Sequence, residues 1–170
     1  MLFRSPGVLN RVASLMRARS FNIESLAVSV TERPDASRMT IAIIGDEVQV
    51  EQATKQLYKL IDVLKVQDLT SESIVEHELA LVKVRASVRT RAEVVSIAEM
   101  HRGRVVDLTD ESAIIEVVGE PAEVDRMVEL LRGFGIKELV RTGSVVMSRD
   151  RKSTRLNSSH IPLSRMPSSA

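Results

Sequence analysis

The sequence predicts an α+β protein in which one order of elements, strand-helix-strand-strand-helix-strand, occurs twice in tandem. Four segments carry apolar residues at the spacing of one helix face, and β-rich runs bounded by Gly, Pro or Asp lie between them. Two equivalent helix starts, Gly45-Asp46 and Gly119-Glu120, stand 74 residues apart. This repeat of elements predicts two ferredoxin-like units, one after the other.

The first half opens with a helix and a hairpin. The helix is expected over residues 6–19, with Pro6 in its first turn. Its apolar face is made by Val8, Leu9, Val12, Leu15 and Met16. The runs "NIESLAVSVT" and "SRMTIAIIG" are typical of strands, and Pro34-Asp35 between them predicts the turn of a hairpin.

A second helix is expected after Gly45. Asp46 is a helix-capping residue, and Gln49 stands three positions on, which is the spacing of a capping box. The helical period then continues through Ala53, Leu57, Leu60 and Ile61. The following run "VLKVQDL" is expected to be extended, so the first half has the order α-β-β-α-β.

The second half has the same order with its opening strand present. "HELALVKVRA" predicts that strand, a helix is expected from about Thr90, and "RVVDLTD" with "SAIIEVVG" predicts another hairpin. Gly119, Glu120 and Pro121 then start a helix, and "IKELVRTGSVVM" ends the unit as extended chain. The inner faces of the two helices carry Val94, Ile97, Ala98, Val124, Met127, Val128 and Leu131.

The first unit lacks a native opening strand, and both ends of the chain look foreign. Residues 1–5 and 150–170 can be written in codons that match the two ends of a widely used sequencing adapter. We therefore expect both segments to be adapter-derived and residues 150–170 to be a disordered tail. Only residues 2–5 could stand in for the strand. A gap inside the sheet would leave two unpaired edges, which predicts a poorly soluble chain.

The charge is distributed unevenly between the ends and the body. The formal net charge is +1, but residues 150–170 carry +3 and Arg4 adds one more, which leaves residues 6–149 at −3. An acidic body argues against nucleic-acid binding, which needs a basic sheet face with aromatic residues. No apolar run approaches the roughly 20 residues that cross a bilayer, and no signal peptide is recognisable. We expect a cytoplasmic protein without membrane contact.

Signals for catalysis are scarce. Cysteine is absent, and the histidines stand apart: His77 opens a strand, His101 ends a helix and His160 lies in the tail. There is no glycine-rich nucleotide loop, Walker sequence or metal-spaced carboxylate set. Three Phe and one Tyr are too few for a base-stacking platform. We therefore expect no catalytic residue, metal or cofactor in this chain.

The start of the first helix is the segment with the best prospect of binding a ligand. Unpaired N–H groups at a helix start attract anions, and Gly7 has no side chain to keep a carboxylate from the amides of Gly7, Val8 and Leu9. Asn22, at the start of the next strand, offers a donor and an acceptor to an α-amino acid. The same residues are also compatible with a plain helix start and an Asn that ends a loop.

Several separated motifs resemble one known family. "PGVLNRVASLMRARSFNIESLAVSVTERPDASRMTI", "EQATKQLYKLIDVLKVQDLT" and "GIKELVRTG" are similar, in this order, to the regulatory (small) subunits of acetolactate synthase, also called acetohydroxyacid synthase. The resemblance covers nearly all of residues 6–149. It implies an amino-acid-binding ACT domain over residues 6–70, truncated at its N-terminus, a linker over residues 71–76, and a related ferredoxin-like domain over residues 77–149.

The resemblance also implies an effector site. Gly7, Val8 and Leu9 would hold the effector's carboxylate at the helix start. Asn22 and Ile23 would be supplied across an interface between two ACT domains, which implies a homodimer.

Two departures from the family bear on this site. The family's first strand ends in an asparagine just before the helix, whereas Arg4 or its neighbours stand there in this chain. Ser20 stands where the family usually has glycine, and a left-handed turn would cost this serine about 1 kcal/mol.

The function that the resemblance implies is regulation. Such subunits bind the thiamine-diphosphate-dependent catalytic subunit, raise its activity and confer feedback inhibition by valine or a related branched-chain amino acid. Thiamine diphosphate, Mg and FAD are then expected on the catalytic partner. The alternative is an ACT-domain sensor of a different enzyme, which would keep Gly7 and Asn22 but need not carry "QLYKLIDVLKV" or "GIKELVRTG". A stand-alone enzyme would need a catalytic constellation that the chain lacks.

Overall fold

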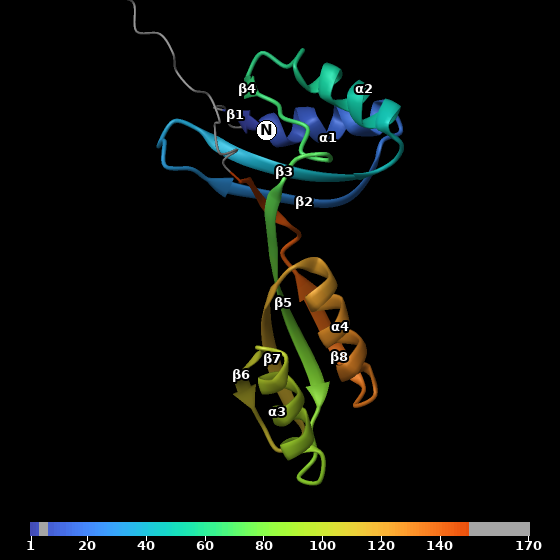
Figure 1. Cartoon of the computed structure of the whole chain (residues 1–170), viewed down its shortest axis with the longest axis vertical. Helices are drawn as coiled ribbons and strands as arrows, with labels where there is room; N and C mark the ends of the chain where they lie inside the picture. The colour runs from blue at the N-terminus through green and yellow to red at the C-terminus, as the bar shows by residue number, and fades with distance from the viewer. Residues whose placement is uncertain (4–6, 150–170) are drawn as a thin grey trace, which may run out of the picture.

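The computed structural model describes residues 1–3 and 7–149 and shows two α+β units arranged end to end (Figure 1). In each unit two helices pack on one antiparallel sheet, and the strands have the same topological order. The predicted fold class is therefore confirmed. Our expectations for residues 4–6 and for residues 150–170 lie outside the described residues.

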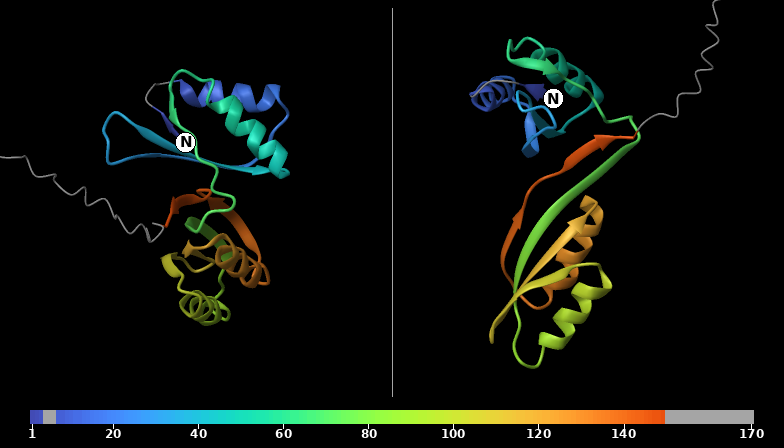
Figure 2. Two further views of the ribbon diagram at one scale, coloured as in Figure 1. Left: turned by 45° about the horizontal axis from the view of Figure 1, so that its top comes forward. Right: turned by 90° about the vertical axis from the view of Figure 1, so that its left-hand side faces the viewer.

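The first unit has the sheet order β2-β3-β1-β4, with α1 and α2 over one face (Figure 2). Its elements are β1 (Leu2–Phe3), α1 (Val8–Ala18), β2 (Asn22–Val30), β3 (Ser37–Ile44), α2 (Glu47–Leu57) and β4 (Val63–Lys65). The helices and the sheet enclose a core of Phe3, Val8, Val12, Met16, Met39, Ala53, Leu57 and Val66. Because β2 pairs only with β3 in the described chain, its outer side is an edge of the sheet.

β1 occupies the place that we expected to be empty. Leu2 pairs with Arg38 of β3 and with Lys65 of β4, and the Phe3 side chain is buried in the core. The expected gap between β3 and β4 is therefore wrong at these two residues. The position requires an extended backbone and a buried apolar side chain, and Leu2-Phe3 supplies both even if it is foreign to the domain. The predicted poor solubility loses this part of its support.

α2 begins at the predicted cap and ends earlier than its apolar period. The Gln49 N–H donates to the Asp46 carboxylate over 2.8 Å, and the Asp46 N–H donates to the Gln49 side chain over 3.1 Å. The helix ends at Leu57, and the expectation that Ile61 lies on its inner face is wrong, since Ile61 is 89% exposed. Residues 58–62 form turns before β4. The helical spacing of apolar residues therefore extends beyond the last residue of the helix.

The second unit repeats the topology with the order β6-β7-β5-β8. Its elements are β5 (Ile74–Arg85), α3 (Arg91–Met100), β6 (Arg104–Leu108), β7 (Ser112–Gly119), α4 (Pro121–Arg132), β8 (Ile136–Arg141) and β9 (Val145–Ser148). Both helices pack on the inner faces of β5 and β7. α4 starts after Gly119, at the place that the repeat predicted, and the Glu120 N–H donates to the Glu123 side chain over 3.1 Å.

The last extended segment is two strands rather than one. Gly143 has a φ of +77°, a left-handed conformation that favours glycine, and it separates β8 from β9. β9 turns toward the first unit and pairs with residues 74–77 of β5 (Figure 2). β5 itself begins at Ile74, within the segment expected to be the linker, so a two-stranded ribbon carries the chain from one unit to the other.

α1 ends in a Schellman motif that places Ser20 in the left-handed region. Ser20 has a φ of +56°, its N–H donates to the Arg17 carbonyl, and the Phe21 N–H donates to the Met16 carbonyl over 3.0 Å. The left-handed turn that we expected at this serine is therefore present. Arg102, after the equivalent helix α3, has a φ of +59°.

Ser20→Gly is expected to raise the free energy of unfolding by about 0.5–1 kcal/mol. Glycine removes the strain of the left-handed conformation, which stabilises the folded state. It also raises the conformational entropy of the unfolded chain, which offsets part of that stabilisation. Urea unfolding of the parent and the variant measures the change, with Arg102→Gly as the matched control in the second unit. No gain in either variant would show that these turns are not strained.

Candidate effector site at the start of α1

The first turn of α1 presents backbone donors that no side chain of the described residues caps. Gly7 occupies the N-cap with a φ of +89°, and the Arg11 N–H donates to its carbonyl over 3.2 Å as the first helical bond. Within the described residues no side chain caps this end, and the first turn has no acidic residue. The amide groups of Val8 and Leu9 therefore remain as donors at the positive end of the helix dipole.

The two side chains beside these amides, Val8 and Leu9, differ in burial. Val8 is 1% exposed and fixes the start of α1 in the core, whereas Leu9 is 45% exposed next to the amides. A β-carbon added to Gly7 would meet no atom of the described residues within 4 Å, apart from its chain neighbours. A small carboxylate has access to the amides, and an aliphatic side chain attached to it has Leu9 as a neighbour.

The two predicted halves of the site lie at opposite ends of α1. Asn22 and Ile23 start β2, beyond the Schellman motif, with Asn22 exposed and Ile23 partly packed on the core. The 11 residues of α1 separate them from Gly7 by about 16 Å at 1.5 Å per residue. One chain thus brings together Gly7, Val8 and Leu9, and a site that also contains Asn22 and Ile23 requires a second chain.

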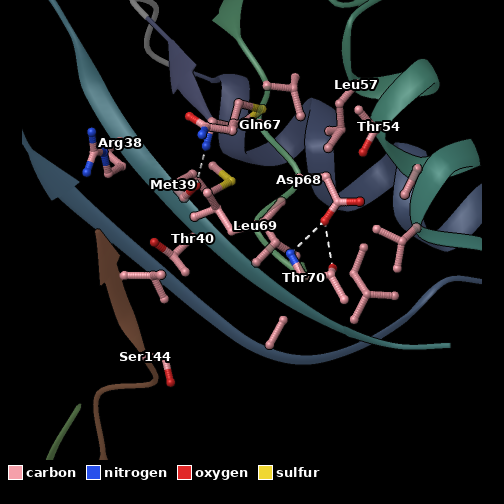
Figure 3. A pocket seen from close by; sticks show the side chains of 18 of the residues that line it. Arg38, Met39, Thr40, Thr54, Leu57, Gln67, Asp68, Leu69, Thr70 and Ser144 are labelled. Atoms are coloured by element: carbon pink, nitrogen blue, oxygen red, sulfur yellow. Dashed lines mark hydrogen bonds between the residues drawn. The ribbon is translucent and has the colours of Figure 1, made fainter. Parts of the chain in front are cut away.

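A cavity that the sequence did not indicate lies between the two units. Its volume is about 370 Å³, and it is bounded by β3, residues 65–70, α2 and the β5–β9 ribbon (Figure 3). Within it, Asp68 accepts hydrogen bonds from the Thr70 side chain and N–H, which lower the pKa of the Asp68 carboxyl. Because its walls come from segments far apart in the chain, no local pattern could have predicted it.

The N-terminal amine lies at one end of this cavity. The Met1 ammonium donates to the Met39 carbonyl over 2.9 Å. Burial lowers the pKa of this amine below its ordinary value of 8.0, and the nearby charges of Arg38 and Lys65 lower it further. Folding therefore favours the neutral amine, and this group makes the protein more stable as the pH rises from its lowered pKa toward 8.0.

Acetylation of Met1 is expected to raise the free energy of unfolding near pH 6 and to flatten its rise toward about pH 9. The acetyl group removes the charge that burial disfavours and keeps one N–H donor for the Met39 carbonyl. Urea unfolding of the acetylated and unmodified chains at both pH values measures the difference. An identical pH dependence in the two forms would show that the amine is not buried.

The remaining titratable residues give little sign of other chemistry. His77 lies in β5 and His101 follows α3, while His160 lies outside the described residues. Among residues 1–3 and 7–149, no group of three or more His, Asp or Glu side chains is placed to hold a metal ion. No helix in this part of the chain has the length and apolar character needed to cross a membrane.

Comparison with known proteins places both units in one family, the small subunits of acetolactate synthase. Residues 77–150 match the family model for the small subunit of acetolactate synthase, and residues 4–65 match that for the small-subunit-like ACT domain of the same enzyme. The probable acetolactate synthase small subunit of Archaeoglobus fulgidus is 52% identical over 86% of this chain and 92% of its own length. The acetolactate synthase small subunit of Aquifex aeolicus is 50% identical over 85% of this chain and 76% of its own length.

A solved structure supports the comparison at the level of the fold. The crystal structure of the acetolactate synthase small subunit from Thermotoga maritima superposes with a TM-score of 0.81 at 40% identity. The match covers 89% of this chain and 95% of the Thermotoga chain.

Proposed function

Because the chain belongs to the family of acetolactate synthase small subunits, we propose that it regulates the catalytic subunit of that enzyme. In this role it binds the catalytic subunit, raises its activity and confers feedback inhibition by valine in branched-chain amino acid biosynthesis. The chain contributes no catalytic residue of its own. Thiamine diphosphate, Mg and FAD belong to the catalytic partner, and the chain needs neither nucleic acid nor a membrane.

The observation that supports the effector part of the proposal is the start of α1, whose first-turn amides no side chain of the described residues caps. A valine carboxylate can accept hydrogen bonds from the amides of Val8 and Leu9 at the positive end of the helix dipole. Leu9 is placed to contact the isopropyl group, since it is half exposed beside these amides. Leucine or isoleucine offers the same carboxylate with a different aliphatic group.

A homodimer through the ACT domains completes this site. In the described chain β2 is an edge strand of nine residues, and its unpaired side is a template for pairing with a second copy. Asn22 and Ile23 lie at the start of that strand, so a second chain paired along β2 presents its own Asn22 and Ile23 at the interface. This supports a shared site in which each α1 start receives residues from the partner.

Regulation then follows from linkage between two binding events. Valine binds more tightly to a state of the complex in which the catalytic subunit is less active, and it shifts the population toward that state. By the same linkage, the catalytic subunit in its active state lowers the affinity of the ACT dimer for valine.

Sedimentation velocity of this chain, its catalytic subunit and their mixture tests the partnership. We expect the mixture to give a new, faster-sedimenting species that contains both subunits. The chain alone is expected to sediment as a dimer. Separate boundaries at micromolar concentrations of both proteins would contradict the proposed partnership, and an ACT-domain sensor of a different enzyme would then be the better description.

A further inference from the structure

The connection from α2 to β4 exposes apolar side chains to solvent (Figure 1). Leu60 and Val63 pack on the core of the first unit, whereas Ile61 between them is 89% exposed. Tyr58 and Leu64 are exposed as well. Single exposed apolar residues are common, but three within one short connection form a cluster of the kind that marks an interaction site. We call Tyr58, Ile61 and Leu64 the α2–β4 surface.

Two side-chain hydrogen bonds hold this connection in place. The Tyr58 hydroxyl donates to the Val66 carbonyl over 2.6 Å, and the Arg11 guanidinium donates to the Asp62 carboxylate. These bonds lie on either side of Ile61 in the chain, so the turn that carries it is tied to the end of β4 and to α1. A surface that is fixed before binding loses less conformational entropy when a partner docks.

One lysine gives the α2–β4 surface a positive charge. Two acidic side chains close to it in the chain are already paired, Glu51 with Lys55 and Asp62 with Arg11. Lys59 lies in the same connection, is exposed, and has no acidic partner among the described residues. The surface is therefore complementary to an apolar patch that has an acidic group at its rim.

The α2–β4 surface lies at the opposite edge of the sheet from β2. The strand order of the first unit is β2-β3-β1-β4, so a homodimer paired along β2 leaves the β4 edge uncovered. The second copy of this chain is then accounted for at the other edge. A different protein is therefore the better occupant of the α2–β4 surface.

The surface is also connected to the candidate effector site. Arg11, which binds Asp62, donates its N–H to the Gly7 carbonyl in the first turn of α1. About one helical turn thus separates the amides proposed to bind valine from the ion pair at the α2–β4 connection. A partner whose activity responds to an effector is expected to contact an element that the effector also contacts, and α1 with its ion pair meets this condition.

We propose that the α2–β4 surface docks on the catalytic subunit of acetolactate synthase, at an apolar patch of that subunit with an acidic residue at its rim. Ile61 enters the centre of the patch, and Lys59 pairs with the acidic residue. This inference rests on the regulatory function proposed above and adds to it the face of the chain that meets the partner.

Activation of the purified catalytic subunit by the full chain, by its Ile61→Asp variant and by its Val88→Asp variant tests this surface. Ile61→Asp places a negative charge in the apolar contact beside the acidic rim, so we expect half-maximal activation to need at least about tenfold more chain. Val88 is the matched control because it is 80% exposed in the second unit, and we expect Val88→Asp to activate like the parent. Both substitutions replace exposed side chains, so both variants should unfold at the same urea concentration as the parent.

The outcomes separate the docking surface from the function itself. Equal activation by Ile61→Asp and the parent would overturn the docking surface and leave the regulatory function standing. Equal weakening by Ile61→Asp and Val88→Asp would also overturn it, since the effect would then follow the added charge rather than its position. A parent chain that neither binds nor activates the catalytic subunit would contradict the regulatory function, and the docking surface with it.

Lys59→Glu tests the charge at the rim, with Lys137→Glu of β8 as its matched control, since both lysines are exposed. We expect Lys59→Glu to slow association with the catalytic subunit several-fold at low salt, measured by biolayer interferometry. About 0.5 M NaCl should remove most of this difference, because salt screens the lost attraction. Lys137→Glu should associate at the parent rate. Association of Lys59→Glu at the parent rate in low salt would contradict the acidic rim.

Discussion

Gly7→Asp is expected to remove valine inhibition of the holoenzyme and to leave activation by this chain in place. An aspartate at position 7 places a negative charge at the positive end of the helix dipole, where the valine carboxylate would bind. Charge-assisted hydrogen bonds contribute about 1.5–3 kcal/mol each. Loss of one or two of them predicts a rise of at least roughly tenfold in the valine concentration for half-inhibition, measured by acetolactate formation.

Gly7→Asn is the matched control for this prediction. Asparagine has the shape of aspartate, meets the same left-handed φ of +89° at this position and carries no charge. We expect it to keep much more of the valine response than Gly7→Asp. Equal loss in the two variants would assign the effect to shape, and unchanged inhibition in Gly7→Asp would place the effector site elsewhere.

Arg141→Met is expected to lower the free energy of unfolding by about 2–3 kcal/mol at neutral pH. The Arg141 guanidinium donates to Glu78 of β5 and, over 2.7 Å, to Asp125 of α4, and these bonds raise the pKa of Arg141. The Glu78 side chain is only 5% exposed, so the variant buries a carboxylate without its cation. The expected loss is smaller than for a fully buried pair, because the Arg141 side chain is 34% exposed.

The pH dependence and a double variant check the cause of this loss. An unpaired buried carboxylate has a raised pKa, so the Arg141→Met variant should recover stability relative to the parent as the pH falls from about 7 to about 5. Glu78→Leu in the Arg141→Met background removes the buried charge and should restore most of the stability in urea unfolding. A double variant no more stable than Arg141→Met would assign the loss to packing of the arginine stem.

The features that could be predicted from the sequence are those set by residues close together in the chain. The capping box of Asp46 and Gln49 involves residues three apart. The left-handed turn at Ser20 was indicated by the family resemblance, which usually has glycine at this position. The topological order of both sheets followed from the repeat, because handed crossovers leave few other arrangements.

The features that escaped prediction depend on pairing between distant segments. Gly143 marks a break in the last extended run, but the partner of β9 could not be predicted, since β9 pairs with the start of β5 some 70 positions earlier. Ile61 continues the helical period but lies in a turn, because the chain must reverse there to reach β4. The donors at the start of α1 were predictable, whereas the cavity between the units is bounded by segments from different parts of the sequence.

The measurement that tests the central claim most directly is acetolactate formation by the purified catalytic subunit as this chain is added, and then as valine is added to the mixture. We predict that activity rises to a plateau with the added chain and then falls with valine, while the catalytic subunit alone responds weakly or not at all to valine. Activity that neither rises with the chain nor falls with valine would contradict the regulatory function.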